Sequence, residues 1–141
     1  MKKSISNTSR TLQYLRSQGY YVDIAERFIS VSGKYLSGRA GIRKDLFNFI
    51  DIVALGEKSI FGVQSCGSDF SAHFRKITQS VDIAENALKW LECGRILLIG
   101  WRKVKLHRGG KAMRWMPRIR EIYEKDFYLC DKRRSDKKHE Q

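Results

Sequence analysis

The sequence predicts a single α/β domain in which a mixed central sheet is flanked by helices. Apolar runs with the alternation or continuity of strands occur at 20–28, 47–55, 59–66 and 95–101. Apolar residues at helical spacing precede the first run and follow the third. The expected order is a helix, three strands, helices, a strand and a final hairpin. This order is typical of a sheet with helices beside it. The length of 141 residues suits one domain.

The first element is predicted to be a helix near the N-terminus. Thr8 or Ser9 is a suitable N-cap, and Leu12 and Leu15 supply an apolar face. Gly19 stands where a C-terminal cap is expected. The helix should therefore end just before the first strand begins.

Three strands are expected next. The strand at 20–28 is followed by residues 30–44, where glycines alternate with basic residues. That stretch indicates either a flexible basic loop or a hairpin connection. The strand at 47–55 is apolar on both faces, which favours a central place in the sheet. A tight turn at Gly56 then leads into the strand at 59–66.

The second half is predicted to add two helices, a buried strand and a basic hairpin. The helices lie around 70–77 and 83–91, and the strand at 95–101 is almost wholly apolar. The hairpin covers 102–122. Its return strand contains Pro117, which lacks an N–H group and therefore places that strand at a sheet edge or a bulge.

The charge of the chain points to a polyanionic partner. Twenty-eight Lys and Arg stand against fifteen Asp and Glu, a formal net charge of +13. Part of this excess lies in residues 131–141, a tail expected to be disordered beyond a domain at 1–130. The other basic residues are dispersed through the domain, which favours nucleic acid over a merely solvated cationic surface.

Cysteine and hydropathy exclude several classes of protein. Cys66, Cys93 and Cys130 form no Cys-x-x-Cys pair, so neither a zinc finger nor a disulfide framework is predicted. No apolar run is long enough for a signal peptide or a membrane span. We expect a cytoplasmic protein, in the host cytoplasm if it is phage-encoded, with no membrane partner.

Three oxygen-bearing side chains are candidates for a metal site. Asp51 lies inside an apolar strand, where a carboxyl group is costly unless it is paired or binds a metal. Gln64 on the next strand and Glu26 near the end of the first can project from the same end of the sheet. Such donors suit Mg²⁺. The alternative is that Asp51 and Gln64 form hydrogen bonds with loop backbone, and that Glu26 pairs with Arg27 or Lys44.

The run from Arg43 to Leu55, followed by 62–66, resembles the core of the PD-(D/E)XK nuclease superfamily. That superfamily includes restriction enzymes, archaeal Holliday-junction resolvases and small phage or virus-type nucleases. Its core is a helix, a three-stranded hairpin sheet, a helix and a further strand, the order expected here over roughly 9–101. The resemblance implies a single nuclease-like domain with a restriction-endonuclease-like core, and a DNA endonuclease that requires Mg²⁺ or Mn²⁺.

The resemblance also implies roles for individual residues. Asp51 matches the metal-binding aspartate, Gln64 the acidic position of the second half-motif, and Glu26 the glutamate of resolvase-like members. No proline precedes Asp51, and Cys66 occupies the place of the lysine. In some members the lysine comes from the following helix, where Lys76 lies. Lys76 is therefore the candidate catalytic lysine, with a solvated helix position as the equally weighted alternative.

The basic residues are expected to hold DNA. Cations interleaved with aromatic residues, such as Trp101 and Trp115 of the hairpin, can meet phosphates while the rings stack on bases. The alternative is that both tryptophans pack across the sheet. The predicted DNA contacts are Arg39, Arg43, Lys44, Arg75, Arg102, Lys105, Arg108, Lys111 and Arg114.

The sequence thus predicts a divalent-metal-dependent DNA endonuclease, with branched DNA as a candidate substrate. A junction-resolving enzyme cuts two strands, so that substrate would imply a homodimer. Two alternatives stand beside this hypothesis. One is a DNA-binding module with a disarmed nuclease fold, and the other is a basic RNA-binding protein.

Overall fold

The computed structural model describes residues 4–30 and 41–128. In it, a mixed five-stranded sheet has the strand order β1-β4-β5-β6-β7. The β5–β6 pair is parallel and the other neighbouring pairs are antiparallel. The expected α/β class with a mixed central sheet is therefore confirmed. The strands are β1 (Tyr21–Ile24), β4 (Ile52–Leu55), β5 (Ile60–Cys66), β6 (Arg95–Lys105) and β7 (Met113–Ile122).

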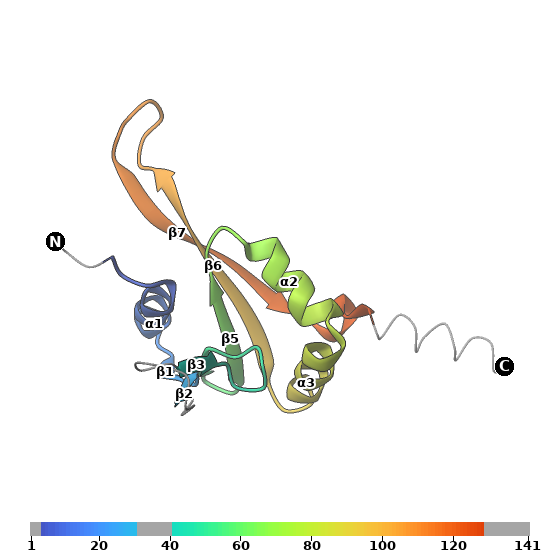
Figure 1. Ribbon diagram of the computed structural model, residues 1–141. Helices are drawn as coiled ribbons and strands as arrows, with labels where there is room; N and C mark the ends of the chain where they lie inside the picture. Colours follow the sequence, from blue (N-terminus) through green and yellow to red (C-terminus); the bar gives the residue numbers. More distant parts are fainter. Residues whose placement is uncertain (1–3, 31–40, 129–141) are drawn as a thin grey trace, which may run out of the picture.

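Helices cover both faces of this sheet (Figure 1). Helix α1 (Asn7–Ser17) packs Leu12 and Leu15 against one face, in a cluster with β4, β5 and β6. Helices α2 (Phe70–Gln79) and α3 (Val81–Leu91) pack on the other face, which also contacts Phe127 beyond the short helix η1 (Glu124–Asp126). Apolar residues of the central strands therefore alternate between two separate cores.

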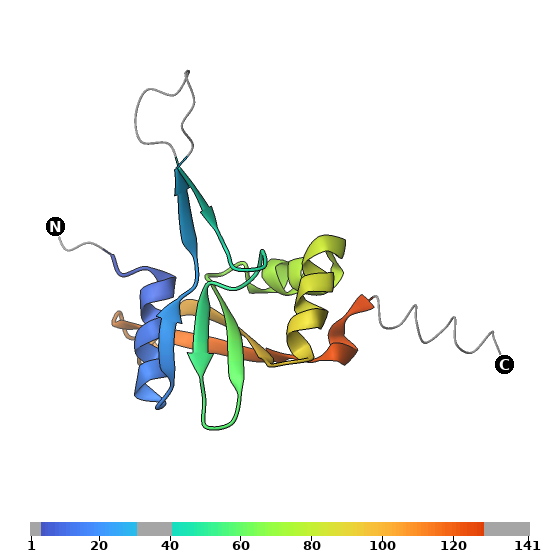
Figure 2. The same ribbon diagram turned by 90° about the horizontal axis from the view of Figure 1, so that it is seen from below.

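A second, two-stranded sheet stands away from the main one. It is formed by β2 (Arg27–Ser30) and β3 (Gly41–Lys44), which project from the body of the domain (Figure 2). A hairpin connection was one of the two interpretations of residues 30–44, and the paired strands support it. The predicted continuous strand at 20–28 is wrong, because the chain leaves β4 after Ile24 and pairs with β3 from Arg27 onward.

Two other boundaries differ from the prediction. Helix α1 starts earlier, because Ser6 is the N-cap and its hydroxyl accepts from the Ser9 N–H at 3.1 Å. Strand β4 starts later, at Ile52, because Phe47 and Asn48 adopt φ of 53° and 66°. These left-handed values turn the chain sharply and interrupt an extended strand.

The predicted C-terminal hairpin is confirmed. Strand β6 continues past the core, and β7 returns alongside it with Lys105 opposite Met113. The part from Arg102 to Met116, here called the β6–β7 arm, projects beyond the helices as a ribbon (Figure 1). Strand β7 is an edge strand, as Pro117 predicted. Across the described ranges, no helix is both long and apolar enough to cross a membrane.

Candidate metal centre

The end of the β1–β4 pair brings Glu26 next to Asp51. The last pair of this ladder is Ile24 with Ile52. Beyond this pair, the backbone N–H groups of Ala25 and Glu26, which follow Ile24, both donate to the carbonyl oxygen of Asp51, at 2.8 and 3.2 Å. Glu26 therefore lies in the link between β1 and β2 rather than inside a strand.

The second sheet brings Asp45 next to Glu26. Its first pair is Arg27 with Lys44. Glu26 directly precedes β2 and Asp45 directly follows β3, so both stand beside this pair. Because β2 and β3 run antiparallel, these two residues lie side by side where the small sheet joins the large one.

A tight loop then places Asp45 opposite Asp51. An isolated antiparallel bridge joins Leu46 to Ile50, and Asp45 and Asp51 flank it on either side. The loop between them contains the two left-handed residues, Phe47 and Asn48. The Asn48 N–H donates to the Asp45 carbonyl oxygen at 3.1 Å, which closes the turn.

Three carboxylates meet where these strand pairs join. One carboxylate oxygen from each of Glu26, Asp45 and Asp51 lies within 4.8 Å of the others, and the three residues could hold a metal ion. Asp51 is only 8% exposed, whereas the other two are half-buried. Sequence reasoning found two of them and missed Asp45, which lies in a run of basic residues ahead of the predicted strand.

Burial and crowding raise the pKa of Asp51 to about 8. The main cause is desolvation, followed by a carboxyl–carboxyl hydrogen bond with Asp45, and the negative charges of Asp45 and Glu26 add to it. The hydrogen bond that the Ser65 N–H donates to Asp51 Oδ2, at 2.9 Å, acts in the opposite direction. Without a cation, the cluster therefore retains a proton near neutral pH.

Gln64 belongs to the same site. It follows Val63, the partner of Ile52, so it lies opposite Asp51 across the β4–β5 pair. Its side chain is 4% exposed, and Nε2 donates to Asp45 Oδ2 at 3.4 Å. Within the described ranges, the nearest basic group is Arg43, whose Nε lies 4.0 Å from Glu26 Oε1. Among the described residues, the ionic partner of Glu26 is thus Arg43 rather than Arg27 or Lys44.

Cys66 and Lys76 have different environments from the acids. Cys66 is buried beside Phe70, and desolvation raises the pKa of its thiol to about 12, so it is a packing residue rather than a nucleophile. Lys76 is exposed on α2, and among the described residues it forms no ion pair or hydrogen bond with the acids. Its neighbour Arg75 is exposed as well.

The predicted DNA-binding residues form two groups. Arg43 and Lys44 are exposed on β3, directly before Asp45. Arg39 lies outside the described residues. The second group is exposed on the β6–β7 arm and its connecting loop, and consists of Arg102, Lys105, Arg108, Lys111 and Arg114.

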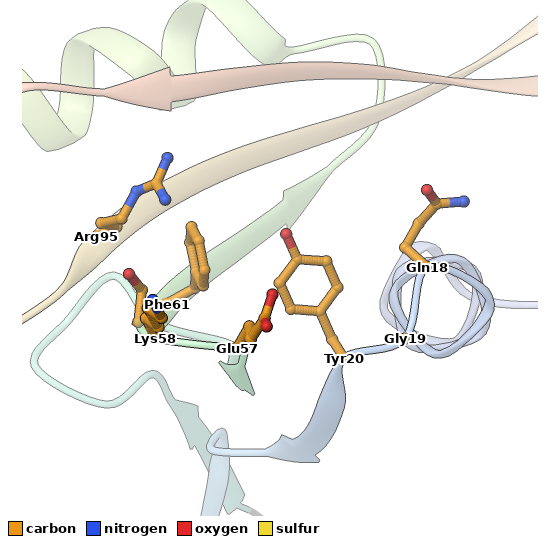
Figure 3. Close-up of a pocket in the computed structure, with 9 residues that line it drawn as sticks. Gln18, Gly19, Tyr20, Glu57, Lys58, Phe61 and Arg95 are labelled. Atoms are coloured by element: carbon orange, nitrogen blue, oxygen red, sulfur yellow. The ribbon is translucent and has the colours of Figure 1, made fainter.

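A cavity of about 450 Å³ lies at the other end of β5 (Figure 3). Tyr20, the Glu57–Lys58 turn and Arg95 line it. The Arg95 guanidinium lies over the Phe61 ring and is also paired with Glu121. Because this arginine is already paired and no acid of the cluster lines the cavity, the cavity is separate from the candidate metal centre.

Comparison with protein-family models, with curated proteins and with solved structures gives no match to this chain.

Proposed function

We propose that this chain is a divalent-metal-dependent DNA endonuclease with a restriction-endonuclease-like core, and that branched DNA is among its substrates. The observation that carries the proposal is the meeting of Glu26, Asp45 and Asp51 within 4.8 Å at one end of the sheet. Neighbouring basic residues on β3 and a second basic group on the β6–β7 arm supply contacts for a polyanion.

The donor set fits a hard divalent cation. Carboxylate oxygens are the protein ligands that Mg²⁺ and Mn²⁺ prefer. Asp51 retains a proton because it is buried and, in addition, because three acids crowd together; a cation would replace that proton and reduce the repulsion. Arg43 is largely exposed and reaches only Glu26, so it neutralises little of the charge.

Each residue has a role in this proposal. A bound ion would polarise the scissile phosphate and lower the pKa of the attacking water. Asp51, Asp45 and Glu26 would hold that ion, while Gln64 orients the Asp45 carboxylate through its Nε2. Lys76 would orient the water or stabilise the charge that develops on the phosphate.

The decisive experiment measures cleavage of labelled duplex, single-stranded and four-way-junction DNA with Mg²⁺, Mn²⁺ or EDTA. Asp45→Asn and Asp51→Asn should each abolish metal-dependent cutting while leaving DNA binding intact. Asp23→Asn is the matched control, because Asp23 lies on β1 and, among the described residues, its carboxylate accepts one hydrogen bond, from the Ile24 N–H at 2.9 Å. Preference for the junction would further predict a homodimer, which sedimentation can test.

A second function is favoured by one specific observation. Cys66 stands where a catalytic lysine is expected, and Lys76 forms no ion pair with the acids among the described residues. A DNA-binding module that no longer cuts would have these features. Tight binding of DNA without cleavage under either metal would support it and overturn the endonuclease.

A further inference from the structure

A groove of about 490 Å³ separates helix α1 from the β6–β7 arm. Its floor is aromatic and fixed. Trp101 is 7% exposed, and its Nε1 donates to Thr11 Oγ1 at 2.8 Å. Tyr14 meets the Trp101 ring edge-on, with centroids 6.1 Å apart. Trp101 is therefore a packing residue and is not available to a ligand.

Trp115 differs from Trp101 in being open to solvent. It lines the same groove, and 40% of its surface is exposed. Pro117, two residues along β7, lines the groove beside it. Residues two apart on a strand point to the same face, so an exposed flat ring stands next to a rigid apolar ring.

Two cations meet the Trp115 ring. The Arg10 guanidinium lies 3.7 Å from its centroid, and the Lys103 ammonium lies 5.2 Å from it. Lys103 is the cross-strand partner of Trp115, whereas Arg10 comes from α1. Neither cation forms an ion pair with a carboxylate in the described part of the chain. Arg10 also donates to Asn7 Oδ1 at 3.1 Å, but this neutral partner leaves its charge unpaired, as that of Lys103 is among the described residues.

The groove is also a neighbour of the metal centre. Thr11, whose hydroxyl accepts from Trp101, shares a hydrogen bond of 2.9 Å with the Ser65 hydroxyl. The Ser65 N–H in turn donates to Asp51. Two residues thus connect the groove floor to the buried acid through hydrogen bonds inside the domain.

We propose that this groove binds an unpaired base of a single DNA strand, stacked on Trp115, with Arg10 and Lys103 on the flanking phosphates. Stacking on tryptophan is stronger than an exposed cation–π contact, so the base displaces Arg10 from the ring toward the phosphate. Bases in a duplex are already stacked on one another. The groove therefore favours splayed or branched DNA, which deepens and rests on the proposed endonuclease function.

The test measures binding in EDTA, where cleavage cannot occur. A short oligothymidylate and a duplex of equal length are titrated against the full chain while tryptophan fluorescence is recorded. Trp115→Ala should weaken oligothymidylate binding about tenfold or more and leave duplex binding nearly unchanged. Trp115→Phe should keep most of the affinity but lose the quenching. Trp90→Phe is the matched control, because Trp90 contacts Phe47 on the other side of the domain and its Nε1 donates to the Arg95 carbonyl oxygen.

Three results would overturn the inference. They are unchanged oligothymidylate affinity in a folded Trp115→Ala chain, an equal loss for duplex and single strand, and quenching that persists in Trp115→Phe. Removing Arg10 or Lys103 should lower the salt dependence of oligothymidylate binding by about one phosphate contact each. The titration needs no metal, so a negative result would contradict the base-binding groove but not the proposed endonuclease activity. Absence of metal-dependent cleavage would contradict the endonuclease but not the groove.

Discussion

Gln64 Nε2 donates to Asp45 Oδ2 at 3.4 Å, from a side chain that is almost completely buried. This contact joins two residues from different strand pairs and places a neutral donor among three acids. The Ser65 N–H supplies a second donor, on Asp51. The acidic cluster is therefore stabilised by neutral N–H groups, with only one distant cation among its described neighbours.

Gln64→Glu should have opposite effects on the stability of the metal-free protein and on its affinity for a metal ion. It replaces a hydrogen-bond donor by a fourth carboxylate, so the free energy of unfolding without metal should fall by about 1–3 kcal/mol. Affinity for Mg²⁺ or Mn²⁺ should rise, because the added charge favours a cation. Denaturation with and without each metal measures both effects. Gln79→Glu, on an exposed position of α2, is the control. An unchanged metal-induced stabilisation would contradict a site at Gln64.

The raised pKa of Asp51 predicts how stability depends on pH. The carboxyl group titrates near 3.8 when unfolded and about 8 when folded. Between these values the folded chain binds the extra proton, so the metal-free protein should lose stability as pH rises from about 4 to about 8. Asp51→Asn should flatten this slope, since its amide carries no proton to lose and can donate to Asp45. Melting temperatures in EDTA across this range measure the effect. A slope that persists in Asp51→Asn, or that disappears in Asp23→Asn, would refute the assignment.

Lys76→Ala tests whether α2 supplies the catalytic lysine. Because Lys76 is exposed, its removal should leave the melting temperature nearly unchanged. Metal-dependent cleavage should fall about 100-fold if its ammonium stabilises the transition state. Single-turnover rates provide the comparison. Lys89→Ala on α3 is the control, since Lys89 is an exposed surface residue paired with Glu92. Equal rates for the two variants would remove Lys76 from the mechanism.

Trp101 should prove structural. Trp101→Phe loses the hydrogen bond to Thr11 and should cost about 1–2 kcal/mol of unfolding free energy. Trp101→Ala also opens a cavity and should cost about 3–5 kcal/mol. Chemical denaturation measures both. Trp115→Phe is the natural comparison and should have little effect on stability, because Trp115 is exposed. An equal loss of unfolding free energy in Trp101→Phe and Trp115→Phe would show that Trp115 also has a structural role, in the β6–β7 arm.

The central elements were predictable because their apolar patterns are strong. The continuous run of β6 and the helical spacing of Phe70, Phe74 and Ile77 leave few alternatives. Pro117 predicted an edge strand correctly, because its missing N–H group is a property of the residue itself and does not depend on the rest of the fold. Asp51 and Gln64 also stood out, since polar residues in apolar strands require a partner.

Asp45 was missed because the turn that delivers it carries only a weak local signal, Asn48, a residue type that tolerates the left-handed region. Left-handed residues are usually glycine, yet here Phe47 and Asn48 adopt positive φ within an apolar run. Asn86 of α3 donates to the Phe47 carbonyl oxygen at 3.1 Å, and the Phe47 ring packs against Trp90. These tertiary contacts support the turn, and sequence spacing does not reveal them. The break between β1 and β2 depends in the same way on pairing with distant strands.

The two edge strands of the main sheet resist intermolecular pairing by different means. Strand β1 is only four residues long, so it offers a short template for a strand from another molecule. Strand β7 is longer but carries Pro117 and several arginines, which deny a backbone donor and repel an identical edge. Met113 and Trp115 are exposed apolar residues on this protected strand. We therefore expect the β7 edge to contribute little to aggregation while these apolar side chains stay accessible to a partner.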